Sequence, residues 1–189
     1  MSSIITGGLS LVAFTLAAVA TPDAAQAQAA HLDDPTIVAI FDAANTADME
    51  TGALAQKQGA SREVRDFGAM LVRDHRMVRQ QGRDLAAKLG VTPTPPKDDQ
   101  SAKDHAATMA RLRGLEGAEF DHAFLQYEAA FHQGVIDALK GTLLPAIQNA
   151  ELKALVEKVA PAFQAHLTMA QQLDKKIAGK GAGDQTSSR

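Results

Sequence analysis

The sequence contains no cysteine and no tryptophan, and it has one tyrosine among 189 residues. Without cysteine the chain can form neither a disulfide framework nor a thiolate metal site. Aromatic residues make up only 4% of the chain, although hydrophobic residues make up 46%. The core must therefore consist mainly of alanine, leucine, valine and phenylalanine. This helix-favouring composition, with few β-branched runs, predicts an all-α fold of one domain.

The sequence also lacks a basic excess and the motifs of several enzyme classes. Its formal net charge is −3, whereas general nucleic-acid-binding proteins usually carry positive charge, so we expect no nucleic-acid partner. It contains no nucleophile elbow, phosphate-binding loop or dinucleotide fingerprint. Asp74 and His75 could act together in acid–base catalysis, but the sequence identifies no substrate pocket beside them. The sequence therefore does not support an enzymatic function, although it does not exclude one.

The N-terminal region has the pattern of an export signal. An apolar run without a charged residue extends from Ile4 to Ala20, and small residues in an Ala-x-Ala arrangement follow it. This pattern predicts a signal peptide over residues 1–29, cleaved after Ala27 or Ala29. The alternative is an uncleaved membrane anchor, which the Ala-x-Ala pattern disfavours. We therefore expect a protein of the periplasm or cell envelope, with no integral membrane span after cleavage.

The remaining sequence predicts four long amphipathic helices within one domain over residues 30–178. Helical periodicity and capping residues place these helices at about residues 35–58, 61–89, 118–140 and 150–178. Asp34 is the expected N-cap of the first helix, and Ser61 that of the second. Gly52 interrupts the first helix, where it either costs about 1 kcal/mol or permits close approach of another helix. A break is expected at residues 141–149 and a disordered tail at 179–189.

The connections determine how these helices pair. The first two helices are joined at Gly59–Ala60, so they should form an antiparallel hairpin. A proline-rich crossover over residues 91–97 and a short helix capped by Ser101 then lead to a second hairpin. We therefore predict an antiparallel four-helix bundle with a short extra helix in the crossover.

Each of the four long helices carries a residue that can bind a metal, well away from the helix ends. His166 lies in the centre of an apolar stripe, and His132 follows Glu128 by four residues, so that both occupy one side of a helix. His75 lies on the inner half of the second helix, and Glu50 faces or flanks the interior. The predicted metal ligands are Glu50, His75, Glu128, His132 and His166.

The type of site follows from the number and kind of these ligands. Bundle interiors hold the di-metal sites of carboxylate proteins, but the carboxylates here are too few for a standard di-iron site. One mononuclear site for Zn, Fe, Mn or Cu fits better. Met77 and Met169 would allow a copper variant, although methionine at such positions is more often core filler. The alternative is a buried hydrogen-bond network without metal, which fixes the register of the helices.

Several of these segments resemble a known family. They are Phe41–Glu50, Ser61–His75, Gly117–Asp121 with Tyr127 and His132, and Pro161 with His166. In these segments the chain resembles the exported bacterial proteins that carry the domain of unknown function DUF4142, over about Pro35 to Leu173. The resemblance implies a ferritin-like bundle and export. Members are often labelled outer membrane proteins, a label that fits poorly with a helical chain.

The resemblance implies no activity, so the functional hypotheses come from the residues. The first is a periplasmic bundle that binds a metal ion at the His/Glu cluster, for storage, buffering or protection against envelope stress. The second is a structural or interaction module in which the cluster is a hydrogen-bond network. A metal-dependent redox or hydrolytic enzyme is a third hypothesis.

Overall fold

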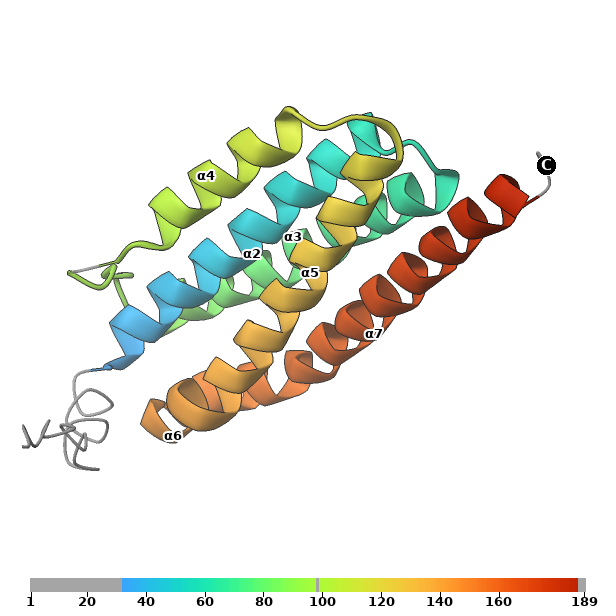
Figure 1. The fold of residues 1–189 in the computed structure, drawn as a ribbon. Helices are drawn as coiled ribbons and strands as arrows, with labels where there is room; N and C mark the ends of the chain where they lie inside the picture. The colour runs from blue at the N-terminus through green and yellow to red at the C-terminus, as the bar shows by residue number, and fades with distance from the viewer. Residues whose placement is uncertain (1–31, 98, 187–189) are drawn as a thin grey trace, which may run out of the picture.

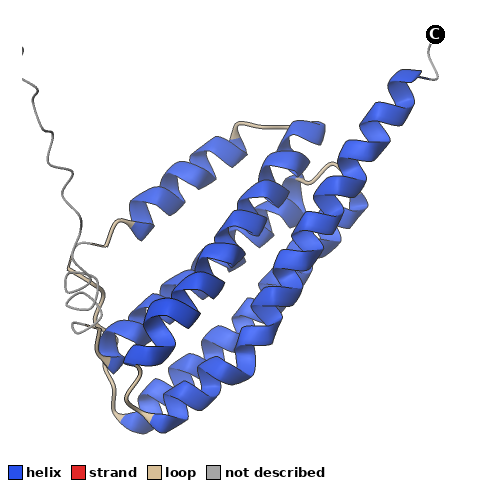
Figure 2. Ribbon diagram, turned by 60° about the horizontal axis from the view of Figure 1, so that its bottom comes forward, coloured by secondary structure: helices blue, strands red, loops and turns tan. Residues whose placement is uncertain are grey.

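Figure 1 shows the computed structural model, which describes residues 32–186 except Asp98, and the side chains as far as Gly179. The predicted signal peptide lies outside the described residues. Within them the chain forms helices and connecting loops without a strand, which confirms the all-α class (Figure 2). The elements are α2 (Asp34–Gln58), α3 (Arg62–Leu89), α4 (Ser101–Arg113), α5 (Gly117–Ala138), the π-helical turn η1 (Leu139–Leu143), α6 (Leu144–Ala146) and α7 (Ala150–Thr186).

Four of these helices form a bundle. α2 packs against α3, α3 against α7, α7 against α5, and α5 against α2 (Figure 1). Asp121, near the start of α5, accepts hydrogen bonds from the backbone amides of Ala60 and Ser61, at 2.8 Å each, so α5 begins where α2 ends. Neighbouring helices in the bundle are therefore antiparallel. α4 lies outside the four, against α2 and α5.

The helix ends agree with the predicted ones in part. Ser61 caps α3 by accepting from the amide of Val64, and Gly90 ends α3 in the left-handed conformation at φ 66°. The N-cap of α2 is Asp33, whereas the sequence predicted Asp34. The carboxylate of Asp34 instead accepts from the amides of Gln148 and Asn149, at 3.0 and 2.8 Å, and so ties the start of α2 to the start of α7. Ser101 is the first residue of α4 and not its cap.

The predicted break at 141–149 is shorter in the structure. The chain stays helical through η1 and α6 and is extended only around Ile147, before α7. Pro145 lies in the first turn of α6, where a proline needs no amide hydrogen bond and therefore does not end a helix. α7 continues to Thr186, beyond the end that the sequence predicted.

α2 and α3 approach to backbone contact at two glycines. A Cβ on Gly68 would lie 2.5 Å from the carbonyl oxygen of Gly52, and a Cβ on Gly52 would lie 2.8 Å from that of Gly68. Real Cβ atoms do not approach an oxygen this closely, so a side chain at either position would push the helices apart. The close approach explains why Gly52 is present in the middle of a helix.

The core consists of two apolar clusters at different heights of the bundle. One cluster surrounds Phe41 and Phe163, and includes Ile37, Val38, Ile136, Leu152, Val156 and Val159. The other surrounds Phe67 and Phe124, and includes Val64, Leu71, Leu112, Phe120, Leu125 and Ala170. Apart from Asp121, which binds the amides at the turn between α2 and α3, the buried polar residues of the long helices lie where these two clusters meet. No described helix combines the length and apolar character that crossing a membrane requires.

Candidate metal centre

A layer of fully buried polar side chains separates the two apolar clusters. Its members are at most 4% exposed and come from all four bundle helices: Asn45, Asp48 and Thr51 from α2, His75 from α3, Glu128 and His132 from α5, and His166 from α7. Burying this many polar groups is unfavourable unless hydrogen bonds or a bound ion compensate the loss of water. The contacts of each histidine show how far this compensation goes.

His75 is held by Asn45 on its outer side. The Asn45 amide nitrogen donates to the carbonyl of Phe41 at 2.8 Å, which turns its oxygen toward His75 Nδ1 at 2.9 Å. His75 must therefore carry its proton on Nδ1, and the lone pair is on Nε2. Burial, with His166 and His132 close by, lowers the pKa of His75 to about 2, so this ring is neutral.

His132 has the same arrangement on α5. Its Nδ1 donates to the backbone carbonyl of Glu128 at 2.9 Å, so the lone pair is again on Nε2. This Nε2 is buried and has no hydrogen-bond partner in the described structure. Burial lowers the pKa of His132 to about 4, so it too is neutral near pH 7.

His166 is held by Asp74 at the edge of the layer. Its Nε2 lies 3.2 Å from Asp74 Oδ2 and donates to it, which leaves Nδ1 facing inward. Burial lowers the pKa of His166, although Asp74 opposes the shift. Burial would raise the pKa of Asp74, but the hydrogen bonds from Arg73 and His166 outweigh it and hold that pKa below its ordinary value. Asp74 is therefore a carboxylate that orients His166.

The three inward-facing nitrogens converge on one region of the layer. The ligand atoms of His75, His132 and His166 all lie within 4.8 Å of one another. His75 Nε2 and His166 Nδ1 are 3.2 Å apart, and if both rings are neutral each presents a lone pair to the other. Two facing lone pairs repel, so this contact requires either a proton or a cation between the two rings.

Asp48, from α2, lies beside two of the three histidines. Its Oδ2 lies 3.5 Å from His75 Nε2, and its Oδ1 lies 3.9 Å from His132 Nε2. A tetrahedral zinc site with bonds of 2.0–2.1 Å places its ligand atoms about 3.3–3.4 Å apart. The 3.2 and 3.5 Å contacts lie close to that spacing, and the 3.9 Å contact exceeds it by about half an ångström. Both oxygens of Asp48 are buried, and the carboxyl group of Glu128 is the one side chain with which Asp48 shares a hydrogen bond in the described structure.

Glu128 stands beside this group and supports it. Its Oε1 accepts from the Thr51 hydroxyl at 2.6 Å, and its Oε2 lies 3.5 Å from His132 Nδ1. Asp48, Glu128 and His132 also offer ligand atoms that lie within 4.8 Å of one another. Burial raises the pKa of Glu128 to about 7, against the effect of the Thr51 hydrogen bond. Burial and the neighbouring Glu128 charge raise the pKa of Asp48 well above its ordinary value. Two carboxyl groups are thus held in a buried layer where a cation would stabilise their ionised forms.

The structure brings together four of the five predicted ligands and places the fifth elsewhere. His75, Glu128, His132 and His166 are all in the buried layer. Glu50 is outside it: its side chain is 54% exposed and pairs with His105 on α4 at 2.8 Å. Two residues along a helix rotate a side chain by about 200°, so Glu50 and Asp48 point in nearly opposite directions. Asp48 takes the place that the sequence analysis gave to Glu50.

A helical signal for Asp48 is present in the sequence. Phe41, Asn45, Asp48 and Ala55 are spaced by four, three and seven residues, which is the period of one helix face, and all four are buried. Apolar spacing predicts an inner face made of Ile37, Ile40, Phe41, Ala44, Ala47 and Leu54. Ile37 and Phe41 are indeed buried, but the other four are only partly buried. The polar character of Asn45 and Asp48 concealed the true inner face.

A comparison with family models agrees with the resemblance seen in the sequence. The model described as domain of unknown function (DUF4142) matches residues 19–173, which include all the residues of the buried layer. The chain belongs to this family. Neither the curated proteins nor the solved structures contain a significant match. The match therefore confirms the family resemblance that the sequence showed. A chemical role must be argued from the geometry of the buried layer.

Proposed function

We propose that this protein binds one transition-metal ion through His75, His132, His166 and Asp48, and acts as a metal-buffering or storage protein of the cell envelope. The observation that carries the proposal is the orientation of the imidazoles. Each ring directs one nitrogen outward to an acceptor, namely the Asn45 amide, the Glu128 carbonyl or the Asp74 carboxylate. Metal-binding histidines show this arrangement, in which the outer hydrogen bond fixes the tautomer and the ring orientation.

The buried polar atoms further support the proposal. His132 Nε2 is buried without a partner, and the buried oxygens of Asp48, which lie near His75 and His132, have only the Glu128 carboxyl group as a polar partner. Leaving a buried polar atom unpaired costs about 1–3 kcal/mol, whereas an ion between these residues would engage them together. Three imidazoles and a carboxylate suit Zn, Fe, Mn or Cu(II). Export remains part of the proposal and rests on the N-terminal sequence pattern.

A second candidate function has one observation in its favour. Where His166 is protonated, it donates to Asp74 and to His75 at once, and the contacts among these three side chains form a continuous hydrogen-bond network. The layer would then specify helix register without any metal. This candidate leaves His132 Nε2 unpaired, which is why we place it second.

The test is elemental analysis of the full chain after export, purified without a chelator or an affinity tag and exposed to Zn, Mn, Fe and Cu. We expect about one ion per chain in the wild type and in His122→Ala, because His122 pairs with Asp174 at the surface. We expect loss of the ion in His166→Ala. A folded wild type without bound metal, or equal metal content in both variants, would reject the proposal. Cell fractionation tests the proposed export, and recovery of the protein in the cytoplasmic fraction alone would reject that part of the proposal.

A further inference from the structure

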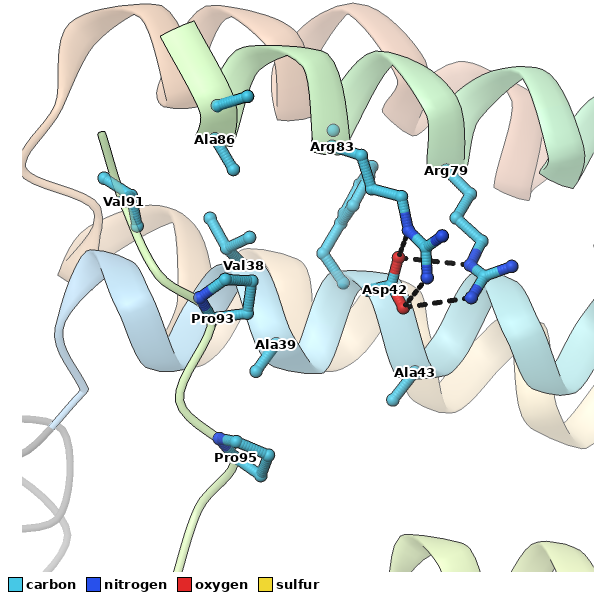
Figure 3. Close-up of a pocket in the computed structure, with 13 residues that line it drawn as sticks. Val38, Ala39, Asp42, Ala43, Arg79, Arg83, Ala86, Val91, Pro93 and Pro95 are labelled. Carbon is cyan, nitrogen blue, oxygen red and sulfur yellow. Dashed lines mark hydrogen bonds and ion pairs between the residues drawn. The ribbon is translucent and has the colours of Figure 1, made fainter. Parts of the chain in front are cut away.

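A second feature of the molecule lies apart from the buried layer, where the crossover passes over α2 and α3. A half-open cavity of about 550 Å³ is enclosed there by the two helices and by the extended segment from Val91 to Pro95 (Figure 3). The amide of Thr94 donates to the carbonyl of Pro35 at 3.1 Å and anchors this segment to α2. The volume lies within the 300–1,000 Å³ range of small-molecule sites.

Small side chains leave the cavity open. The helices contribute Ala39, Ala43, Gly82, Ala86 and Ala87 to its lining. At Gly82 a Cβ would lie 2.8 Å from the ring of Phe41, so the glycine allows this ring to occupy its position in the lining. A larger residue at these places would fill the hollow. The result is an apolar surface under a proline-rich segment.

The two ends of the cavity differ in chemical character. Val38, Val91 and Pro93 lie at one end, and Asp42 with Arg79 and Arg83 lies at the other (Figure 3). Both guanidinium groups use Nε and Nη2 to contact the Asp42 carboxylate, at distances of 2.6–3.3 Å. The charged residues in the lining are these three, so the polar end carries a net charge of +1.

We propose that this cavity binds a fatty acid, with the alkyl chain on the apolar surface and the carboxylate at Arg83. The guanidinium forks already bind a carboxylate, that of Asp42, and a second carboxylate would neutralise the remaining positive charge. Arg83 is the accessible one of the pair, because its side chain is 51% exposed and that of Arg79 is 24% exposed. Arg79 keeps its contact with Asp42 while Arg83 turns to the ligand.

The first test is calorimetric titration of the full chain with saturated carboxylates from octanoate to tetradecanoate, below their micelle concentrations. We expect saturable binding that tightens by up to about fourfold for each added methylene until the cavity is filled. Dodecyltrimethylammonium should bind at least about tenfold more weakly than dodecanoate, because its head group is positively charged, as Arg83 is, and the two repel each other. Absence of saturable binding, or equal affinity for the cationic amphiphile, would overturn the proposal. Tighter binding of dodecyl phosphate than of dodecanoate would overturn the choice of a carboxylate.

Two pairs of variants locate the site. Arg83→Met should weaken dodecanoate binding by about tenfold, whereas Arg76→Met removes an exposed arginine of α3 that is not part of the lining and should have no effect. Ala43→Leu should weaken binding by filling the cavity, whereas Ala53→Leu places leucine at an exposed α2 position outside it. Circular dichroism confirms that each variant is folded. If the first member of each pair binds as its control does, the ligand is not in this cavity.

The proposals for the cavity and for the metal centre can be tested separately. No residue of the buried layer lines the cavity, so His166→Ala should bind dodecanoate as the wild type does. Loss of dodecanoate binding in folded His166→Ala would contradict the assignment to a separate site. Metal content measured on Arg83→Met should equal that of the wild type.

Discussion

At the scale of single residues, the buried layer depends on which side of α2 faces the core. Asp48 is 1% exposed and reaches two of the histidines, whereas Glu50 is half exposed and contacts α4. The chemical types of both residues are equally suitable for binding a metal, so only their position on the helix distinguishes them. We therefore propose Asp48, and not Glu50, as the metal ligand from α2.

This assignment predicts unequal effects for two similar substitutions. Asp48→Asn should lower metal affinity by more than the roughly 10–100-fold that loss of a supporting partner causes, because it replaces a ligand and a charge. Glu50→Gln should leave affinity within about twofold of the wild type. Competition titration against a chromophoric chelator measures both. Equal losses in the two variants, or a larger loss in Glu50→Gln, would show that α2 faces the metal differently.

Asp42 provides a prediction about acid stability that is independent of the metal. Burial would raise the pKa of Asp42, but the hydrogen bonds and charges of Arg83 and Arg79 outweigh it and hold the pKa below its ordinary value. A carboxyl group with a lowered folded-state pKa stabilises the fold above its unfolded pKa of about 3.9, and this stabilisation disappears as the pH falls through the folded-state value.

Asp42→Asn should therefore lower the free energy of unfolding at pH 7 by about 0.5–1 kcal/mol, because the pair is partly exposed. At pH 3 the difference between variant and wild type should shrink. Urea unfolding of chelator-treated protein at both pH values measures it, with Asp66→Asn as an exposed control. A difference that stays constant from pH 7 to pH 3 would show that the charge of Asp42 is not what stabilises the fold.

At the scale of helices, the sequence predicted the positions of the four long helices better than their caps and connections. Periodicity and capping residues located the four long helices because apolar stripes and glycine stops act locally. The N-cap of α2 was missed because it depends on a tertiary contact, which a local pattern does not contain. The Asp34 carboxylate accepts from the amides of Gln148 and Asn149, just before α7, and Asp33 caps α2 instead. The chain after α5 stays helical through residues where a break was expected, because Pro145 lies in the first turn of α6.

The contact between α2 and α3 predicts opposite effects for two glycine substitutions. Gly68→Ala places a methyl group against the backbone of α2 and should lower the free energy of unfolding by about 1–3 kcal/mol or more. Gly134→Ala on α5 meets open space in the middle of a helix and should raise it by about 0.4–1 kcal/mol. Chemical denaturation of both variants compares them. A neutral Gly68→Ala would mean that the two helices are not in backbone contact.

At the scale of the whole molecule, the proposed ligands connect the two hairpins. Asp48 and His75 belong to the hairpin of α2 and α3, and His132 and His166 to the hairpin of α5 and α7. An ion bound by all four would link the hairpins at mid-height, between the two apolar clusters. The sequence predicted that each helix contributes to such a layer. It could not predict the pairing of each nitrogen, because that depends on side-chain contacts across the bundle.

Metal binding should therefore stabilise the entire fold. At a free metal concentration 100 times the dissociation constant, the gain is about 2.7 kcal/mol, which corresponds to a rise in Tm of about 5–10 °C for a domain of this size. Differential scanning calorimetry with and without metal measures the rise, which should be absent in His166→Ala and retained in His122→Ala. A rise of equal size in both variants would place the metal elsewhere.

The most direct measurement is X-ray absorption spectroscopy of the metal-loaded protein, because it reports the atoms around the ion. We predict three imidazole nitrogens and at least one carboxylate oxygen at about 2.0–2.2 Å, with one imidazole contribution lost in folded His132→Ala. A coordination shell made of oxygen atoms alone, or one unchanged in His132→Ala, would contradict the account. The buried layer would then be a hydrogen-bond network that specifies how the four helices pack.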